Sequence, residues 1–314
     1  MSIRKYRLLF LAVLAAPVLP AQTVLLNDTF STATNSGSNM ATVGPQGTQS
    51  PPSSAEWFLI DSTNASATYT NGSPGSLAQV IPSTANSAVI AYFETPGNQQ
   101  TLNVGDSIAI NVSFTVSGPT NVADGIGFGL FNSGSTALAP TQLGANLGGT
   151  TSGNFASYAG IAALINPNVA TTATTTDLDS RATGSNDLTS LASYTAINSP
   201  TGTATIGTDN YMATLSLTYA GAGNMGVGFT LNDTTTSTTV AAYSAAGTTS
   251  TFPTQFDTVF IDGQALAATT LTLSTVNVVF TPVPEPPVYV LCGGGLAVLA
   301  AASSWRRRRA ARAA

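Results

Sequence analysis

Residues 107–116 read Ser107-Ile108-Ala109-Ile110-Asn111-Val112-Ser113-Phe114-Thr115-Val116 and alternate between polar or small and apolar side chains. Successive side chains point to opposite faces of a β-strand, so the larger apolar side chains of this segment share one face. Residues 211–219 repeat the pattern. Residues 271–279 do so with Leu271 and Leu273 and then, after a change of phase, with Val276 and Val278. We therefore expect long strands that each bury one face.

The rest of the body has the same character. Residues 125–131 place Ile126, Phe128 and Leu130 on one side of a strand and glycine on the other. Similar segments lie at 56–61, 77–81, 88–93, 158–164, 225–231, 239–243 and 256–262. Thr, Ser, Gly, Asn and Val are abundant, and the residues that build surface helices are scarce. This pattern over residues 22–281 predicts one all-β domain, a two-sheet antiparallel sandwich, with loops at 31–54, 136–154 and 171–180.

The first 21 residues have the pattern of a secretory signal peptide. Arg4, Lys5 and Arg7 precede an apolar segment at 8–16, and small residues follow as far as Ala21. The apolar segment is too short to cross a membrane. We expect the mature chain to begin near Gln22.

The C-terminal segment has the pattern of a membrane span. Residues 283–287 read Val283-Pro284-Glu285-Pro286-Pro287, residues 288–304 carry no charge, and Trp305 precedes four arginines. A helix over 288–304 would be roughly 25 Å long, slightly shorter than the hydrocarbon core of a bilayer. The arginines predict a cytoplasmic C-terminus, so the residues before Pro284 lie on the other side of the membrane.

This order resembles the bacterial PEP-CTERM sorting signal over residues 282–314. The resemblance implies a sorting motif at Val283, Pro284, Glu285 and Pro286 and a basic stop at Arg306, Arg307, Arg308 and Arg309. It also implies processing by an exosortase-type transpeptidase. The precursor would be anchored in the inner membrane, and the product would be a cell-surface or extracellular-matrix protein. A plain single-span anchor that no enzyme cuts is the alternative.

Charge and residue usage exclude several classes of function. Arg181 is the only basic residue between 22 and 287, where all fourteen Asp and Glu lie, which gives a net charge of −13. Binding of nucleic acid or acidic lipid needs a basic face and is disfavoured. Histidine is absent, and the single cysteine, Cys292, lies in the predicted span. Histidine-dependent triads, histidine-ligated zinc and an intrachain disulfide are therefore excluded.

Short pieces of residues 24–281 resemble the concanavalin A-like jelly-roll sandwiches. They are Asp28-Thr29-Phe30, Trp57-Phe58, Val104-Gly105-Asp106-Ser107, residues 123–131 and residues 275–278. The resemblance implies a jelly roll whose first and last strands pair. Ala123-Asp124-Gly125 also resembles a turn of L-type lectins, which implies that Asp124 accepts hydrogen bonds from a sugar, with Asn132 as a second contact. Those lectins use histidine in their metal sites, and this chain has none. The alternative for Asp124 is a solvent-facing turn without a ligand.

A second group of acidic residues follows the threonine-rich segment. Asp177, Asp179 and Asp187, with Asn186, offer the hard oxygen ligands that calcium prefers, although their spacing is not that of an EF-hand. The alternative is a solvated loop with one ion pair to Arg181. We expect no other cofactor.

The carboxylates do not match a glycosidase of this fold, which needs two of them beside the scissile bond. Glu56 and Glu94 are the only glutamates before the sorting motif, and they lie in different predicted strands. We expect an exported, non-catalytic surface or extracellular-matrix protein that binds polysaccharide and not nucleic acid. A glycan-active hydrolase of the same fold is the alternative.

Overall fold

The computed structural model describes residues 21–30, 57–61, 66–70, 75–81, 86–94, 98–118, 125–134, 155–165, 177–185, 188–189, 193–198, 206–246, 252–264 and 269–283. These residues contain seventeen strands and no α-helix, and every strand pair is antiparallel. The strands belong to one compact unit, Gln22–Pro282. Within the described residues no helix is long and apolar enough to span a membrane, and the predicted span at 288–304 lies outside them.

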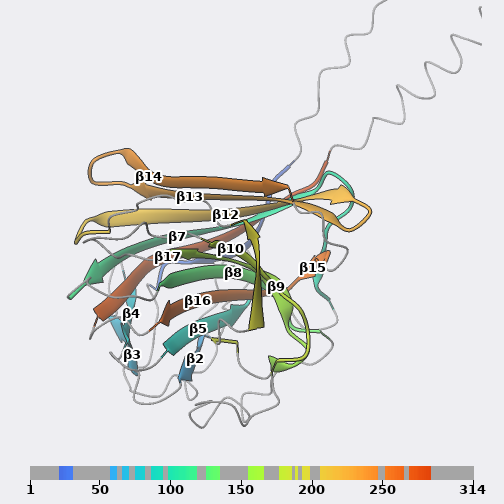
Figure 1. Cartoon of the computed structure of the whole chain (residues 1–314). Helices are drawn as coiled ribbons and strands as arrows, with labels where there is room; N and C mark the ends of the chain where they lie inside the picture. The colour runs from blue at the N-terminus through green and yellow to red at the C-terminus, as the bar shows by residue number, and fades with distance from the viewer. Residues whose placement is uncertain are drawn as a thin grey trace, which may run out of the picture. The chain divides into compact units, whose positions relative to one another are not determined.

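Two large sheets form the layers of the sandwich (Figure 1). Sheet A has the order β14 (Thr238–Ala246), β13 (Asn224–Asp233), β12 (Asn210–Gly221), β7 (Ser107–Ser117), β17 (Thr269–Thr281), β4 (Ser76–Ile81), β3 (Ser66–Thr70), with β1 (Thr23–Asp28) also beside β17. Sheet B has the order β11 (Tyr194–Asn198), β10 (Asp177–Arg181), β9 (Ala159–Ile165), β8 (Ile126–Asn132), β16 (Thr258–Gln264), β5 (Asn86–Tyr92), β2 (Trp57–Asp61). A small third sheet pairs β15 (Gln255–Phe256) with β6 (Gln100–Thr101).

The core lies between the two sheets and is built by the predicted alternation. All five apolar residues named in 107–116 are buried, and the residues between them are partly exposed. The Phe128 ring of sheet B lies 5.3 Å from that of Phe114 and 6.3 Å from that of Phe229, both in sheet A (centroid distances). These contacts join the layers and confirm the two-sheet antiparallel sandwich.

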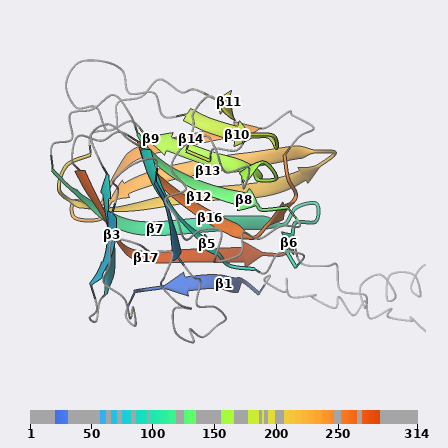
Figure 2. The same cartoon turned by 90° about the horizontal axis from the view of Figure 1, so that it is seen from below.

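Strand β17 confirms the predicted change of phase. Leu271, Leu273, Val276 and Val278 are all buried, and the pairing with β7 shifts between Leu273 and Thr275. Such a bulge adds one residue and returns the following side chains to the same face. One edge of β17 pairs with β7, while β4 and β1 share the other edge, as Figure 2 shows for β1. The expected pairing of the first and last strands is therefore confirmed.

Two of the short sequence pieces meet at the start of the domain. The indole N–H of Trp57 donates to Asp28 Oδ2 at 2.7 Å, and the backbone N–H of Phe30 donates to Asp28 Oδ1 at 2.8 Å. The Phe30 and Trp57 rings lie 5.6 Å apart. All three residues are buried, so this carboxylate holds the end of β1 against β2.

The loop predicted at 171–180 is wrong for its last residues, because Asp177–Arg181 forms β10 between β9 and β11. Asp179 is 6% exposed and Arg181 is 1% exposed, so the alternative of a solvated loop is wrong as well. The guanidinium of Arg181 donates to the backbone carbonyls of Tyr158, Phe155 and Ser185. These bonds to its two terminal nitrogens offset part of the cost of burying the cation. Strands β3, β6 and β11 were also not expected from the sequence, and the strand expected at 256–262 is divided at Asp257 into β15 and β16.

Candidate functional site

The face of sheet B that points away from the core is covered by other parts of the chain. A second apolar cluster lies on it, made of Ala88, Ile90, Phe131, Phe155, Tyr158, Ala162, Leu188 and Phe260, and each of these residues is buried. Members of this cluster from segments 155–158 and 188–189 lie outside the strands of the sheet. In the described residues this face is therefore a second core and not an open binding surface.

A hydrogen-bonded junction lies at one end of sheet B, around the buried carboxylate of Asp257. Asp257 Oδ1 accepts from the backbone N–H of Ser133 at 2.9 Å and from the hydroxyl of Thr258 at 2.7 Å, and its Oδ2 accepts from the hydroxyl of Ser133 at 2.5 Å. The backbone carbonyl of Asp257 accepts from the N–H of Phe93 at 2.8 Å. Because protein donors engage both carboxylate oxygens, this residue fastens strand ends together.

Burial changes the acidity of this junction. It raises the pKa of Asp257, and burial together with the nearby Asp257 raises the pKa of Glu94. The hydroxyl of Tyr92 is hydrogen-bonded to that of Tyr158, whose pKa is raised mainly by burial. The junction therefore favours neutral forms of its acids.

The residues expected to bind sugar are placed only in part. Asn132 ends β8, and its Oδ1 accepts from the backbone N–H of Gly134 at 2.7 Å. That acceptor closes a turn within the protein. Asp124 lies outside the described residues, so the sugar contacts of Asp124 and Asn132 stay predictions.

The expected calcium ligands are likewise placed only in part. Asp177 and Asp179 lie two positions apart on β10, at the register positions of Leu164 and Ala162 of β9. Asp187 and Asn186 lie outside the described residues. Within the part of the chain that the structure describes, no cluster of three metal-ligating side chains is found. In the tail, Val283 is exposed, and Pro284, Glu285, Pro286 and Arg306–Arg309 lie beyond the described residues.

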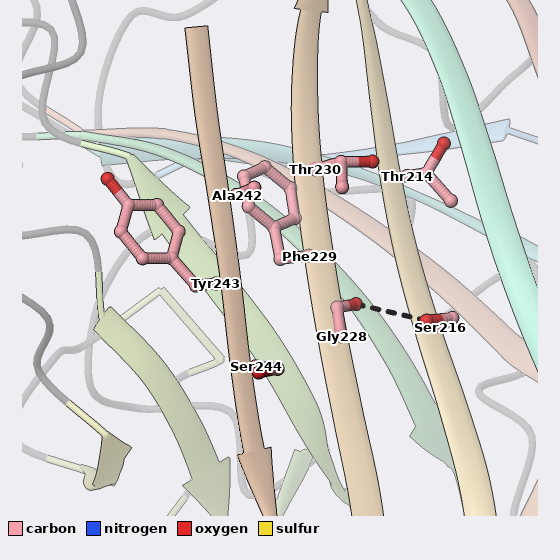
Figure 3. A pocket seen from close by; sticks show the side chains of 8 residues that line it. All are labelled: Thr214, Ser216, Gly228, Phe229, Thr230, Ala242, Tyr243 and Ser244. Carbon is pink, nitrogen blue, oxygen red and sulfur yellow. Dashed lines mark hydrogen bonds between the residues drawn. The ribbon is translucent and has the colours of Figure 1, made fainter. Parts of the chain in front are cut away.

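An open hollow of about 240 Å³ lies on sheet A (Figure 3). We call it the hydroxyl trough, and it is lined by Thr214 and Ser216 of β12, Gly228, Phe229 and Thr230 of β13, and Ala242, Tyr243 and Ser244 of β14. The strand register sets Ser216, Gly228 and Ser244 in one row, and Thr214, Thr230 and Ala242 in the next. The buried neighbours of these residues alternate to the core side, so both rows point away from the core.

Gly228 creates the depth of the trough. It carries no side chain between Ser216 and Ser244, and neighbouring strands lie about 4.8 Å apart, so the two serines face each other across roughly 10 Å. A Cβ atom at position 228 would lie 2.8 Å from the Ser216 hydroxyl oxygen. That hydroxyl donates to the carbonyl of Gly228 at 3.3 Å (Figure 3).

The trough offers hydrogen bonds without formal charge. No Asp, Glu, Lys or Arg lines it, and its hydroxyls both donate and accept. The polar surface continues to both sides: the Thr214 hydroxyl donates to Asn111 Oδ1 at 2.8 Å, and the Thr239 hydroxyl donates to Asn232 Oδ1 at 2.9 Å. This chemistry suits an uncharged ligand rich in hydroxyl groups, and it supplies neither metal ligands nor a general base.

Sequence reasoning missed the trough. Its signal was present in residues 225–231, where Gly226, Gly228 and Thr230 alternate with the apolar residues that were used to predict the strand. Glycine at an outward position of a strand commonly marks the close approach of a ligand or a backbone.

No family model matches the chain, and no curated protein matches it. Several solved structures are similar. The Ca2+-bound exoplasmic/lumenal domain of VIP36 is 14% identical over 77% of this chain and 90% of that chain, with a TM-score of 0.45. Arcelin-5, a lectin-like defence protein from Phaseolus vulgaris, is 12% identical over 83% of this chain and 99% of its own, with a TM-score of 0.44. A Lotus tetragonolobus seed lectin is 15% identical over 74% of this chain and 100% of its own, with a TM-score of 0.39. At this level of similarity the assignment of a β-sandwich rests on the strand pairing described above.

Proposed function

We propose that this chain is an exported, non-catalytic surface protein that binds a neutral polysaccharide in the hydroxyl trough of sheet A. The observation that carries the proposal is an open hollow lined by hydroxyls and free of charged side chains. Sugar hydroxyls that lose water on binding need protein donors and acceptors in return, and serine and threonine supply both. An acidic polysaccharide would meet the net charge of −13 on residues 22–287 and would be repelled.

The same geometry favours binding over hydrolysis. A glycosidase of the usual kind holds two carboxyl groups beside the scissile bond, and the trough has none. Asp257 and Glu94 are neighbours elsewhere, but protein hydrogen bonds engage both carboxylate oxygens of Asp257.

The first test fills the trough. The exported protein is screened on an array of neutral and uronic-acid polysaccharides, and the neutral polysaccharide bound best is titrated by calorimetry. Gly228→Val places a branched side chain between Ser216 and Ser244 and should weaken binding at least tenfold, or about 1.4 kcal/mol. Ala78→Val, on the outward side of β4 in the same sheet, is the matched control and should bind like wild type.

The opposite results have distinct meanings. If Gly228→Val binds like wild type and Asp124→Asn loses about 1–3 kcal/mol of binding free energy, the site lies at the lectin-like turn Ala123-Asp124-Gly125 and not in the trough. Release of shortened sugar chains from the polysaccharide would reject the non-catalytic reading.

We further propose that the tail directs sorting, on the support of the sequence order of motif, apolar segment and arginines. Mass spectrometry of the exported protein should find a C-terminus within or just after residues 283–287. Glu285→Ala should leave an uncut precursor in the inner membrane. Mature surface protein that still carries Trp305 and the arginines would instead indicate a plain anchor.

A further inference from the structure

Both ends of the domain leave sheet A at the same place, which we call the exit end. Thr281, the last residue of β17, pairs with Ser107 of β7, and Ser107 pairs with Thr218 of β12. Thr23, the first residue of β1, pairs with Phe280. The exit end comprises Thr23, Ser107, Thr218, Phe280 and Thr281, the turn at 102–106, the β12–β13 hairpin and the end of β14 at Ala246.

The exit end exposes no charged side chain among its described residues. Its exposed residues are Thr23, Asn103, Val104, Gly105, Thr218, Ala220, Ala222, Asn224 and Ala246. Its one carboxylate, Asp106, is 3% exposed and accepts from the backbone N–H of Asn103 at 2.8 Å. Val104 is 64% exposed, the highest value for a large apolar residue in the described chain. Glu94, partly exposed at the same end of sheet B, has its pKa raised by burial and by Asp257.

This distribution is unusual for a domain whose residues 22–282 hold thirteen acidic residues and one arginine, a net charge of −12. Charges that lie within a Debye length of about 8 Å of an anionic lipid surface are repelled by it. An end without exposed carboxylates can approach that surface without repulsion, and an exposed valine can enter the headgroup layer. Thr281 also lies only seven residues before Val288, the first residue of the predicted span, and seven residues reach at most about 25 Å.

We propose that the exit end lies against the lipid headgroup layer while the chain is anchored, with Val104 and the β12–β13 hairpin at the contact. The proposal rests on the proposed export and anchoring of the chain. The anchor holds the domain at the membrane, and the uncharged end allows close contact. The hydroxyl trough begins near the exit end on β12–β14 and stays open on the outward side of sheet A.

The single cysteine of the chain makes a clean test possible. In full-length protein carrying Cys292→Ala, a fluorophore is attached at Val104→Cys, at Asn224→Cys or at Val80→Cys. Val80 is also an exposed valine of sheet A, and it pairs with Thr270 of β17. Thr270 lies eleven residues before Thr281 on the same strand, so Val80 is roughly 35 Å from the exit end. Each protein is reconstituted into phosphatidylethanolamine–phosphatidylglycerol vesicles that contain a nitroxide-headgroup lipid.

Quenching by the nitroxide should be at least twofold stronger at positions 104 and 224 than at position 80. Equal quenching at all three positions in protein that floats with the vesicles would overturn the contact and leave the anchoring intact. Protein that does not float with the vesicles would overturn the anchoring, and with it this proposal.

Discussion

Arg181 is the only cation of the domain, and the structure buries it. Its guanidinium binds three backbone carbonyls and so holds segment 155–158 and Ser185 to the end of β10. Arginine suits this position because its planar group presents several donors in fixed directions. The residue predicted as the partner of a solvated loop is instead a structural link at the side of sheet B.

Removing these donors should therefore destabilise the domain. Arg181→Met keeps the apolar length of the side chain but removes three hydrogen bonds to backbone carbonyls, two of them buried, so we expect a loss of more than about 2 kcal/mol in the free energy of unfolding. Arg181→Lys should recover only part of the lost stability, because an ammonium group cannot donate in the fixed directions of the planar guanidinium. Urea unfolding of the three proteins gives the comparison, and a Met variant as stable as wild type would contradict the role of the hydrogen bonds.

At the scale of the element, strands with strict alternation were predictable and polar strands were not. Strands β7, β8, β12 and β17 follow directly from periodicity, including the bulge in β17, because each buries a regular row of apolar side chains. Strand β10 has Leu178 as its only apolar residue, and its place comes from backbone pairing with β9 and β11. The outward glycines of residues 225–231 were a signal for the trough, but its walls could not be predicted, because they depend on the register of three strands, which sequence alone does not fix.

The junction at the end of sheet B should give stability a measurable pH dependence. Burial raises the pKa values of Asp257 and Glu94 above their ordinary 3.8 and 4.5, so near those values the folded state binds more protons than the unfolded state. The contribution of these two groups to the free energy of unfolding is therefore fully present below their ordinary pKa values. It is lost as the pH rises through their raised pKa values.

Glu94→Gln isolates one of these groups. The variant cannot ionise at this position, so its stability relative to wild type should increase from low pH towards neutrality. Asp233 changes stability with pH in the opposite direction, because hydrogen bonds, first from the backbone N–H of Thr236, lower its pKa. Asp233 is present in both wild type and Glu94→Gln, so its effect cancels in the difference between their stabilities. Urea unfolding across this pH range is the measurement, and a difference that is constant with pH would contradict the assignment.

At the scale of the whole molecule, stability comes from apolar burial and backbone pairing. With one cation against fourteen acids in residues 22–287, networks of ion pairs are not available. Added salt screens the repulsion among the carboxylates and has few attractive pairs to weaken. The thermal midpoint should therefore stay constant or rise slightly as sodium chloride is added, as circular dichroism would show. A marked decrease would instead show that attractive ion pairs stabilise the fold.

The pairing of β1 with β17 has a consequence for the time course of folding. Asn277 donates to the carbonyl of Leu26 across 251 positions of sequence, so β1 cannot gain this neighbour until almost the entire domain has been made. Contacts of such high sequence separation form slowly. Under the proposed export, β1 stays without this neighbour until β17 has also crossed the membrane, so completion of the fold would be coupled to arrival of the tail.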